Sequence, residues 1–217
     1  HSLSGSVDWY LTLDNVLLNF LAEGFYTKLN DPFTTVSQSL PNGTTVETIV
    51  NASGAKVYGV TLEARASVNN NIQLQMGGTV QKSRYDEARK WSDVDNSNIE
   101  ETKKMMRTPD VYGYFVATWT PSKRINTSLS GTYTGSMLVP HERLMVTKES
   151  PDFFDMNWKV AYTVPMYKSI NLELNAGVQN IFNAYQNDLD KGKDRASSYI
   201  YGPSMPRSYF VGAKLSF

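Results

Sequence analysis

The sequence contains no cysteine among its 217 residues, which excludes disulfide bridges, thiolate metal sites and a thiol nucleophile. Only two histidines are present, His1 and His141, and they are too far apart in the sequence to suggest a metal site. We expect each to be a solvated terminal or loop residue. Positive and negative side chains balance at 21 each, which gives no reason to expect a nucleic-acid partner. No stretch approaches the roughly 18 apolar residues of a transmembrane helix.

Apolar residues do alternate with small or polar ones, most regularly in the final stretch, 207–217. A period of two is typical of a strand with one apolar and one polar face. This ending resembles that of bacterial outer-membrane proteins, in which such a pattern is read by the assembly machinery. The membrane-insertion signal would then comprise Tyr209, Val211, Leu215 and Phe217. An ordinary C-terminal edge strand is the alternative.

The same alternation recurs along the chain and predicts nine strands. They cover residues 4–13, 16–29, 57–68, 72–81, 110–120, 125–137, 154–164, 170–178 and 209–217. The connections between them alternate between short turns and long loops. A β-sandwich has comparable turns at both ends, whereas an outer-membrane barrel has short periplasmic turns and long external loops. The sequence therefore predicts an all-β fold, an antiparallel transmembrane β-barrel.

The dimensions and the aromatic residues agree with this prediction. The apolar row of residues 58–68 is about 25 Å tall at the usual strand rise and tilt, which matches the apolar band of an outer-membrane barrel. Aromatic residues lie near the short turns at Trp9, Trp119, Tyr162 and Phe217. A second belt lies towards the long loops at Tyr26, Tyr58, Tyr133, Phe154 and Tyr209. Trp158 falls in mid-strand and fits neither belt.

Three further expectations concern the breaks in the pattern. Phe25-Tyr26 interrupts the alternation and suggests a bulge. The stretch 31–55, which includes Pro41-Asn42-Gly43-Thr44-Thr45, has no clear period and is expected to be a polar loop. Bacterial single-chain barrels have an even number of strands. Nine strands therefore suggest the C-terminal piece of a larger barrel, with the partner of the first strand upstream of His1.

Some segments resemble a known family. Gly177-Val178-Gln179-Asn180-Ile181-Phe182-Asn183-Ala184-Tyr185 and Tyr199-Ile200-Tyr201-Gly202-Pro203, followed by Pro206-Arg207 and the terminal Phe217, resemble the closing strands of TonB-dependent outer-membrane receptors, especially those of Bacteroidetes-type bacteria. Thr108-Pro109 and Gly131-Thr132-Tyr133-Thr134-Gly135 fit the same pattern.

The resemblance implies that residues 1–217 are the C-terminal portion of a receptor barrel with twenty-two strands and a plug in its lumen. It also implies import of a scarce ligand such as a ferric siderophore, haem or cobalamin, and a location in the bacterial outer membrane. The expected partners are the lipid bilayer, the outer-membrane assembly machinery, the transported ligand and the TonB complex. TonB would be contacted through an N-terminal part that these residues do not include. The ending is closer to siderophore- and cobalamin-type receptors than to glycan importers.

Charged residues on the polar side of the strands would line the lumen in such a receptor and contact the plug. They are Glu23, Glu63, Arg65, Asp155, Lys159 and Glu173. The alternative is a solvated outer face of a soluble sheet, which needs no partner, and the lumen is the favoured interpretation. Aromatic and cationic residues on the predicted external loops could stack on an anionic ligand or pair with it. These candidates are Tyr85, Arg89, Trp91, Tyr199, Tyr201 and Arg207, with loop packing as the competing explanation.

No catalytic residues, cofactor or resident metal are expected. Paired carboxylates for glycoside chemistry would have to face each other across a cleft, and the sequence does not place any such pair. The segment Asp188–Asp194 resembles an acidic calcium loop but departs from the EF-hand pattern at Gly192 and Lys193. We expect a solvated external loop there. Two other classes stay open: a passive porin or adhesin-type barrel, and a soluble all-β carbohydrate-binding or enzyme domain.

Overall fold

The structure is a computed structural model that describes residues 1–39, 45–51, 53–92, 99–167 and 169–217. Its secondary structure consists of strands, and no helix in these ranges is long and apolar enough to cross a membrane. The strands are β1 (Ser2–Leu13), β2 (Val16–Leu29), β3 (Phe33–Ser39), β4 (Thr45–Asn51), β5 (Ala55–Val68), β6 (Ile72–Arg89), β7 (Thr102–Lys104), β8 (Val111–Ser122), β9 (Ile125–Thr134), β10 (Leu138–His141), β11 (Val146–Glu149), β12 (Phe153–Pro165), β13 (Asn171–Gln179) and β14 (Ser208–Ser216).

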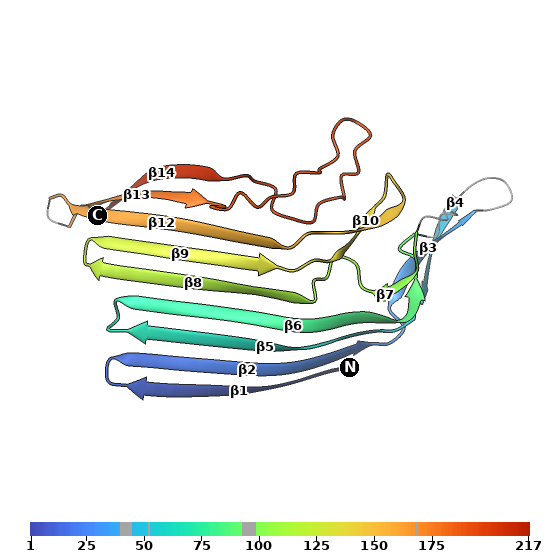
Figure 1. Cartoon of the computed structure of the whole chain (residues 1–217), viewed down its shortest axis with the longest axis horizontal. Coiled ribbons are helices and arrows are strands. Elements are labelled where there is room, and N and C mark those ends of the chain that lie inside the picture. The colour runs from blue at the N-terminus through green and yellow to red at the C-terminus, as the bar shows by residue number, and fades with distance from the viewer. Residues whose placement is uncertain (40–44, 52, 93–98, 168) are drawn as a thin grey trace.

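Most of these strands form one antiparallel sheet in the order β1-β2-β5-β6-β8-β9-β12-β13-β14, with the short β7 beside β6. The strands of this path follow one another in the same order along the chain. Only the short strands β3, β4, β7, β10 and β11, which belong to the long connections, are left out of it. The short turns gather at one end of the sheet and the long connections at the other (Figure 1). The prediction of an all-β antiparallel fold is confirmed, and each of the nine predicted strands is present.

The structure differs from the sequence prediction mainly in the long connections. The expected loop over residues 31–55 contains the hairpin β3–β4, although residues 40–44 and 52 lie outside the described residues. A second hairpin, β10–β11, follows β9. Strand β6 continues to Arg89, well beyond the predicted end. The expected bulge at Phe25-Tyr26 is wrong, because β2 pairs in unbroken register with both neighbours, Tyr26 lying opposite Leu3 and Tyr58.

The strand register gives the sheet two chemically distinct faces. Leu62 on β5 lies opposite Ala22 and Gly78, whereas the next residue, Glu63, lies opposite Leu21 and Gly77. Directly paired residues point to the same side of a sheet. The residues paired with Leu62 on successive strands therefore share one face, and those paired with Glu63 share the other. We call the side of Leu62 the apolar face and the side of Glu63 the polar face.

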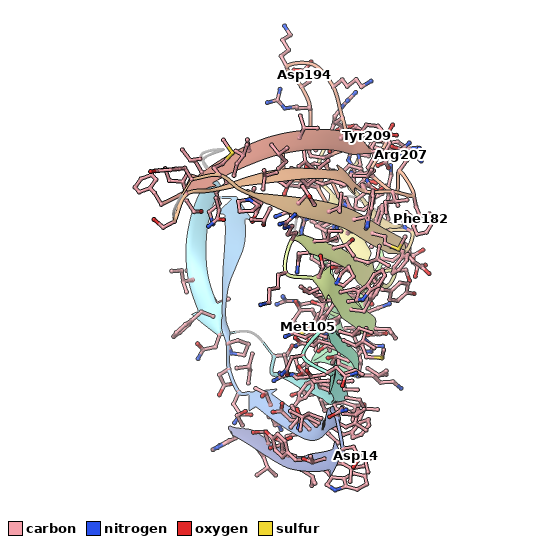
Figure 2. All side chains as sticks on the ribbon, turned by 90° about the vertical axis from the view of Figure 1, so that its left-hand side faces the viewer. Asp14, Met105, Phe182, Asp194, Arg207 and Tyr209 are labelled. Atoms are coloured by element: carbon pink, nitrogen blue, oxygen red, sulfur yellow. The ribbon has the colours of Figure 1, made fainter. Side chains whose placement is uncertain are left out.

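The sheet is curved, and its apolar face lies on the convex side. Tyr209 and Phe182, which stacks on Phe154 of the apolar face at a centroid distance of 5.7 Å, lie on the outer side of the curve in Figure 2. The apolar side chains there are open to the surroundings: Leu62 is 59% exposed and Val211 is 87% exposed. A single-layered wall with an uncovered apolar outer face suits a lipid environment, since soluble monomers rarely expose contiguous apolar patches this large.

Trp158, which lies in mid-strand on the apolar face, has a polar partner of its own. Its indole Nε1 donates a hydrogen bond to Thr127 Oγ1 at 2.9 Å, and Thr127 Oγ1 in turn donates to the Lys159 carbonyl oxygen at 3.0 Å. An indole N–H that faces an apolar environment such as lipid needs an acceptor of this kind. The cross-strand pair therefore explains how this tryptophan can lie between the two aromatic belts.

Candidate functional site

The long connections assemble a small cluster at one end of the sheet. Hairpin β10–β11 packs against the segment 180–207, and the buried core between them consists of Met137, Val139 and Tyr199. We call this assembly the loop cluster (Figure 1). Val139 is fully buried and Tyr199 is 2% exposed. In contrast to the single-layered wall of strands, the loop cluster has a core of its own, so two loops far apart in the sequence are held as one body.

Asp188 is the acceptor around which the loop cluster is organised. Its carboxylate accepts hydrogen bonds from the Tyr199 hydroxyl at 2.9 Å and the Tyr201 hydroxyl at 2.6 Å. Gln186, which is 2% exposed, donates from Nε2 to Asp188 at 3.2 Å and to the Tyr199 carbonyl oxygen at 3.1 Å. The Tyr201 amide donates to Gln186 Oε1 at 2.9 Å. The network fixes both tyrosines to the same loop.

These contacts shift the pKa values of the groups involved. Burial alone would raise the pKa of Asp188, but the hydrogen bonds from Tyr201, Tyr199 and Gln186 outweigh it and hold the pKa below its usual value. Burial and the bond to Asp188 raise the pKa of Tyr201 to about 12, and they raise that of Tyr199 further. At neutral pH the carboxylate is therefore charged, and both phenols keep their protons and donate to it.

His141 is buried in this cluster, at 1% exposure, so the expectation of a solvated loop histidine is wrong. Its ring packs on Tyr199 with centroids 4.2 Å apart, and its Nε2 lies 3.5 Å from the Asp190 carboxylate. Arg143 contacts the same carboxylate at 3.9 Å. The Ala196 amide, followed by His141 and Arg143, lowers the pKa of Asp190. The expected solvated loop at 188–194 is in fact tied to hairpin β10–β11.

Two asparagines anchor the last loop to the sheet. Asn180 and Asn183 both have positive φ, at 50° and 57°. The side chain of Asn180, which is 4% exposed, donates to the Ala184 and Met205 carbonyl oxygens at 3.2 and 2.9 Å and accepts from the Ala184 amide at 2.8 Å. Asn183 Oδ1 accepts from the Arg207 amide at 2.9 Å. The Asn-Ile-Phe-Asn motif thus sets where the chain enters β14.

The predicted ligand-binding residues fall into separate groups. Tyr85 lies within β6, and the Arg89 guanidinium stacks on its ring at 3.7 Å. Trp91 donates from Nε1 to Thr147 Oγ1 in β11 at 3.1 Å. Tyr199 and Tyr201 belong to the loop cluster. Arg207 is exposed at the start of β14. Sequence reasoning did not connect the residues that hold the cluster together: Gln186 was not singled out, and His141, Asp188 and Asp190 were expected to be solvated.

The predicted lumen residues share the polar face. Glu63 and Arg65 form an ion pair at 2.9 Å. Lys159 and Glu173 fall in the same set of cross-strand rows as Glu63, and so do Glu23 and Asp155, as the register shows. Hydrogen bonds join further polar side chains across the strands there, for example from Gln75 Nε2 to the Tyr114 hydroxyl at 2.9 Å.

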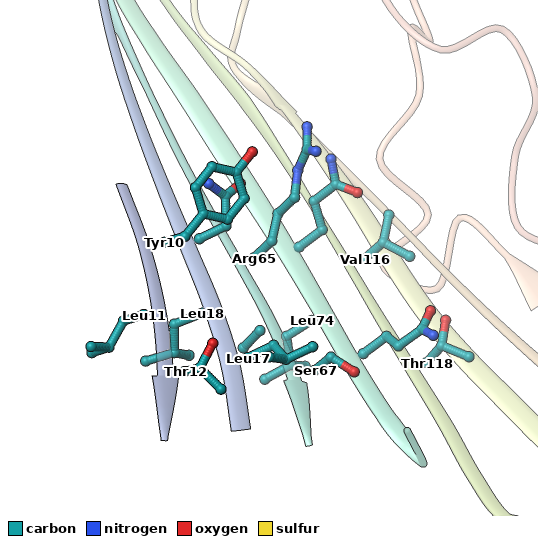
Figure 3. Close-up of a pocket in the computed structure, with 14 residues that line it drawn as sticks. Tyr10, Leu11, Thr12, Leu17, Leu18, Arg65, Ser67, Leu74, Val116 and Thr118 are labelled. Carbon is teal, nitrogen blue, oxygen red and sulfur yellow. The ribbon is translucent and has the colours of Figure 1, made fainter. Parts of the chain in front are cut away.

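Several hollows open on this sheet, and two of them lie where polar-face side chains project. The first, of about 400 Å³, lies near the short turns, and Figure 3 shows the side chains of Tyr10 and Arg65 projecting over it from the polar face. The second, of about 340 Å³, lies near the loop cluster and is lined by Asp155, Asn157 and Met205 among others. Asp155 Oδ1 is buried and has no partner within the described ranges. This acceptor is available to a donor that enters from the polar side.

The part of the chain that the structure describes contains no group of three or more His, Cys, Asp or Glu side chains placed to hold a metal ion. Asp188 and Asp190, which suggested a calcium loop in the sequence, are engaged by tyrosine hydroxyls and by His141 and Arg143 respectively. The loop cluster is thus held together by hydrogen bonds to these carboxylates and by aromatic packing.

Replacing Asp188 tests the loop cluster. We expect Asp188→Asn to loosen it at pH 7 by about 1 kcal/mol, because the buried Tyr199 hydroxyl loses a charged acceptor. Hydrogen exchange of the Tyr201 amide should then quicken roughly fivefold relative to wild type. Because the folded-state pKa of Asp188 is lowered, its contribution is complete above the unfolded value of about 4 and disappears as the pH falls through the folded value. The two proteins should therefore converge at strongly acidic pH.

The control is Asp194→Asn at the exposed tip of the same loop (Figure 2). It should exchange like wild type at every pH. Equal exchange of wild type and Asp188→Asn at pH 7 would contradict the role of this carboxylate.

An antiparallel, two-faced, meandering wall with short turns at one end and long loops at the other defines the class of outer-membrane transport barrels. A comparison with protein-family models agrees: the model described as TonB dependent receptor-like, beta-barrel matches residues 2–181. The chain belongs to this family of TonB-dependent receptor barrels, which are transport receptors of the bacterial outer membrane and not enzymes. No curated protein sequence matches the chain.

Solved structures of similar fold include import receptors and iron transporters. The ferric-catecholate import receptor Fiu of E. coli K12 has a TM-score of 0.65 at 17% identity, over 98% of this chain and 27% of that one. FpvA of P. aeruginosa, bound to ferric pyoverdine, has a TM-score of 0.60 at 12% identity, over 98% and 30%. The FrpB iron transporter of Neisseria meningitidis has a TM-score of 0.58 at 14% identity, with the same coverage. The chain therefore spans under a third of the length of these receptors.

Proposed function

We propose that residues 1–217 are the C-terminal portion of the barrel of a TonB-dependent receptor that imports a scarce ligand of the ferric siderophore, haem or cobalamin class. The observation that carries the proposal is the continuous polar face on the concave side of a wall of this family. Such a face supplies charges and hydrogen-bonding groups along a lumen, and Asp155 offers it an unpaired acceptor. In this proposal a plug upstream of these residues occupies the lumen and contacts Glu23, Glu63, Arg65, Asp155, Lys159 and Glu173.

The ligand class is inferred from similar receptors. Fiu is a ferric-catecholate import receptor, and FpvA is bound to a ferric pyoverdine. For this chain we propose that the ligand is first met at the long loops, where Tyr85, Arg89, Trp91, Tyr201 and Arg207 present rings and cations. Tyr199 takes part through the loop cluster that it supports, since its ring and hydroxyl are engaged internally. In this proposal the TonB complex supplies the energy for import. The outer-membrane assembly machinery inserts the barrel into the membrane.

Energised uptake by cells that carry the full-length receptor tests the proposal. Cells are offered radiolabelled ferric siderophores, haem and cobalamin, with and without a protonophore that removes the inner-membrane proton gradient. We expect saturable accumulation of one of these ligands that falls to background when the gradient is removed. Uptake that is non-saturable and unaffected by the protonophore would instead establish the passive porin alternative. The soluble-domain alternative is already incompatible with membership of the family.

A further inference from the structure

A row of basic side chains crosses four neighbouring strands at the loop end of the apolar face. Lys28 on β2 lies opposite Lys56 on β5, Lys56 lies opposite Arg84 on β6, and Arg84 lies opposite Lys104 on β7. We call these four residues the basic row. In the strand register they continue the same face as Leu62, so their side chains start from the lipid side of the wall and not from the lumen.

The basic row lies directly beyond the upper aromatic belt. Tyr26 lies two residues from Lys28, and Tyr58 lies two residues from Lys56, so both tyrosines border the row on the apolar face. Their rings are 6.4 Å apart. Lys82 lies opposite Tyr58 and adds a further exposed cation. Tyrosines of this kind mark the depth of lipid headgroups in a membrane barrel. The cations therefore lie at headgroup level, at the end of the sheet where the long loops place the outer leaflet.

The charge of the basic row is only partly neutralised within the chain. Asp110 contacts Arg84 at 3.3 Å and Lys104 at 3.7 Å. Lys28 and Lys56 have no ion-pair partner within the ranges that the structure covers. Like charges in directly opposed positions destabilise a sheet, so the arrangement favours an external anion. Arg84 and Lys104 are also only 27% and 22% exposed, which limits the screening that water provides.

We propose that the basic row binds the phosphate groups of lipids in the outer leaflet. Lysine side chains can lay their apolar stems on the tyrosine belt while the ammonium groups reach the headgroups, and an arginine guanidinium can hold a phosphate through two hydrogen bonds. A free phosphate would make no use of the apolar face that borders the row. A phospholipid or phosphorylated glycolipid contacts the apolar face through its acyl chains and the basic row through its headgroup. The proposal depends on the barrel lying in the outer membrane and not on the identity of the transported ligand.

The test uses the full-length receptor, purified in a non-ionic detergent, and a bisphosphorylated lipid A-type glycolipid titrated by native mass spectrometry. The variant Lys28→Gln/Lys56→Gln removes the two unpaired cations. We expect it to bind the glycolipid at least about tenfold more weakly than wild type, because each surface cation contributes appreciably to the attraction of anionic lipid. The matched control, Lys191→Gln/Lys214→Gln, removes the same charge from an external loop and from the polar face, and should bind like wild type.

Three outcomes would overturn the proposal. They are wild-type affinity in the Lys28→Gln/Lys56→Gln variant, equal binding of the same glycolipid without its phosphates, and displacement of the lipid by inorganic phosphate at matching concentration, which would indicate a free-anion site. Folding of each variant is checked by its heat-dependent shift on a gel. If the double variant fails to assemble, Lys56→Gln alone replaces it, with an expected loss of about threefold.

Discussion

Leu62→Arg is expected to block assembly of the barrel in the outer membrane. Leu62 lies midway along β5 on the apolar face and is 59% exposed there. An arginine near the bilayer midplane of a transmembrane barrel costs about 2–4 kcal/mol, which is a large fraction of the stability of most folded proteins. We expect the heat-shifting, folded band of the full-length receptor to fall several-fold in outer-membrane fractions.

The matched control is Leu21→Arg. Leu21 is the same residue type on the neighbouring strand, and it lies opposite Glu63 on the polar face. An arginine there meets a carboxylate instead of lipid, so assembly should stay close to wild type. Equal assembly of Leu62→Arg and Leu21→Arg would contradict the assignment of the two faces.

Asn180→Ala is expected to release the last loop from the sheet and to destabilise the closing strand. The substitution removes hydrogen bonds to Ala184 and Met205 from a residue that is 4% exposed, and it leaves an alanine at a φ of 50°. The left-handed conformation costs roughly 1–2 kcal/mol, and the unpaired backbone groups add about 1–3 kcal/mol. The total loss should be about 3 kcal/mol, visible as a lower unfolding temperature of the purified full-length receptor.

Two controls separate these contributions. Asn70→Ala places an alanine at a φ of 56° in the short turn between β5 and β6, where the asparagine side chain makes no hydrogen bond within the described structure. It should cost only the conformational part, about 1 kcal/mol. Asn180→Gly relieves the backbone conformation without restoring the hydrogen bonds, so it should recover a minority of the loss. Full recovery by glycine would show that the side-chain contacts contribute little.

The wall of the barrel was predictable because its pattern is local. Each strand must present an apolar residue to lipid at every second position, and stretches such as 57–68 show this alternation in the sequence itself. The hairpin β3–β4 was missed because the stretch 31–55 shows no such alternation. The bulge expected at Phe25-Tyr26 was wrong because an aromatic residue on the polar face, Phe25, needs no change of register.

The loop cluster was not predictable because its contacts join positions far apart in the chain. Nothing near His141 in the sequence indicates that Tyr199 will cover it or that Asp190 will lie beside it. The tyrosines were singled out as ligand-binding candidates with loop packing as the alternative, and their common acceptor, Asp188, was interpreted as part of a solvated loop. The motif Asn180–Asn183 carried the strongest signal, because two asparagines at tight turns have a structural reason to be there.

The order of the strands has a consequence for biogenesis. Since every strand of the main path pairs with its successor along the chain, from β1 through to β14, the sheet can grow by adding one hairpin at a time to an existing edge, and no segment has to thread past another. The small core of the loop cluster, by contrast, unites β10–β11 with residues just before β14. Its two loops follow β9 and β13, so it can form only after β9, β12 and β13 have come together in the sheet.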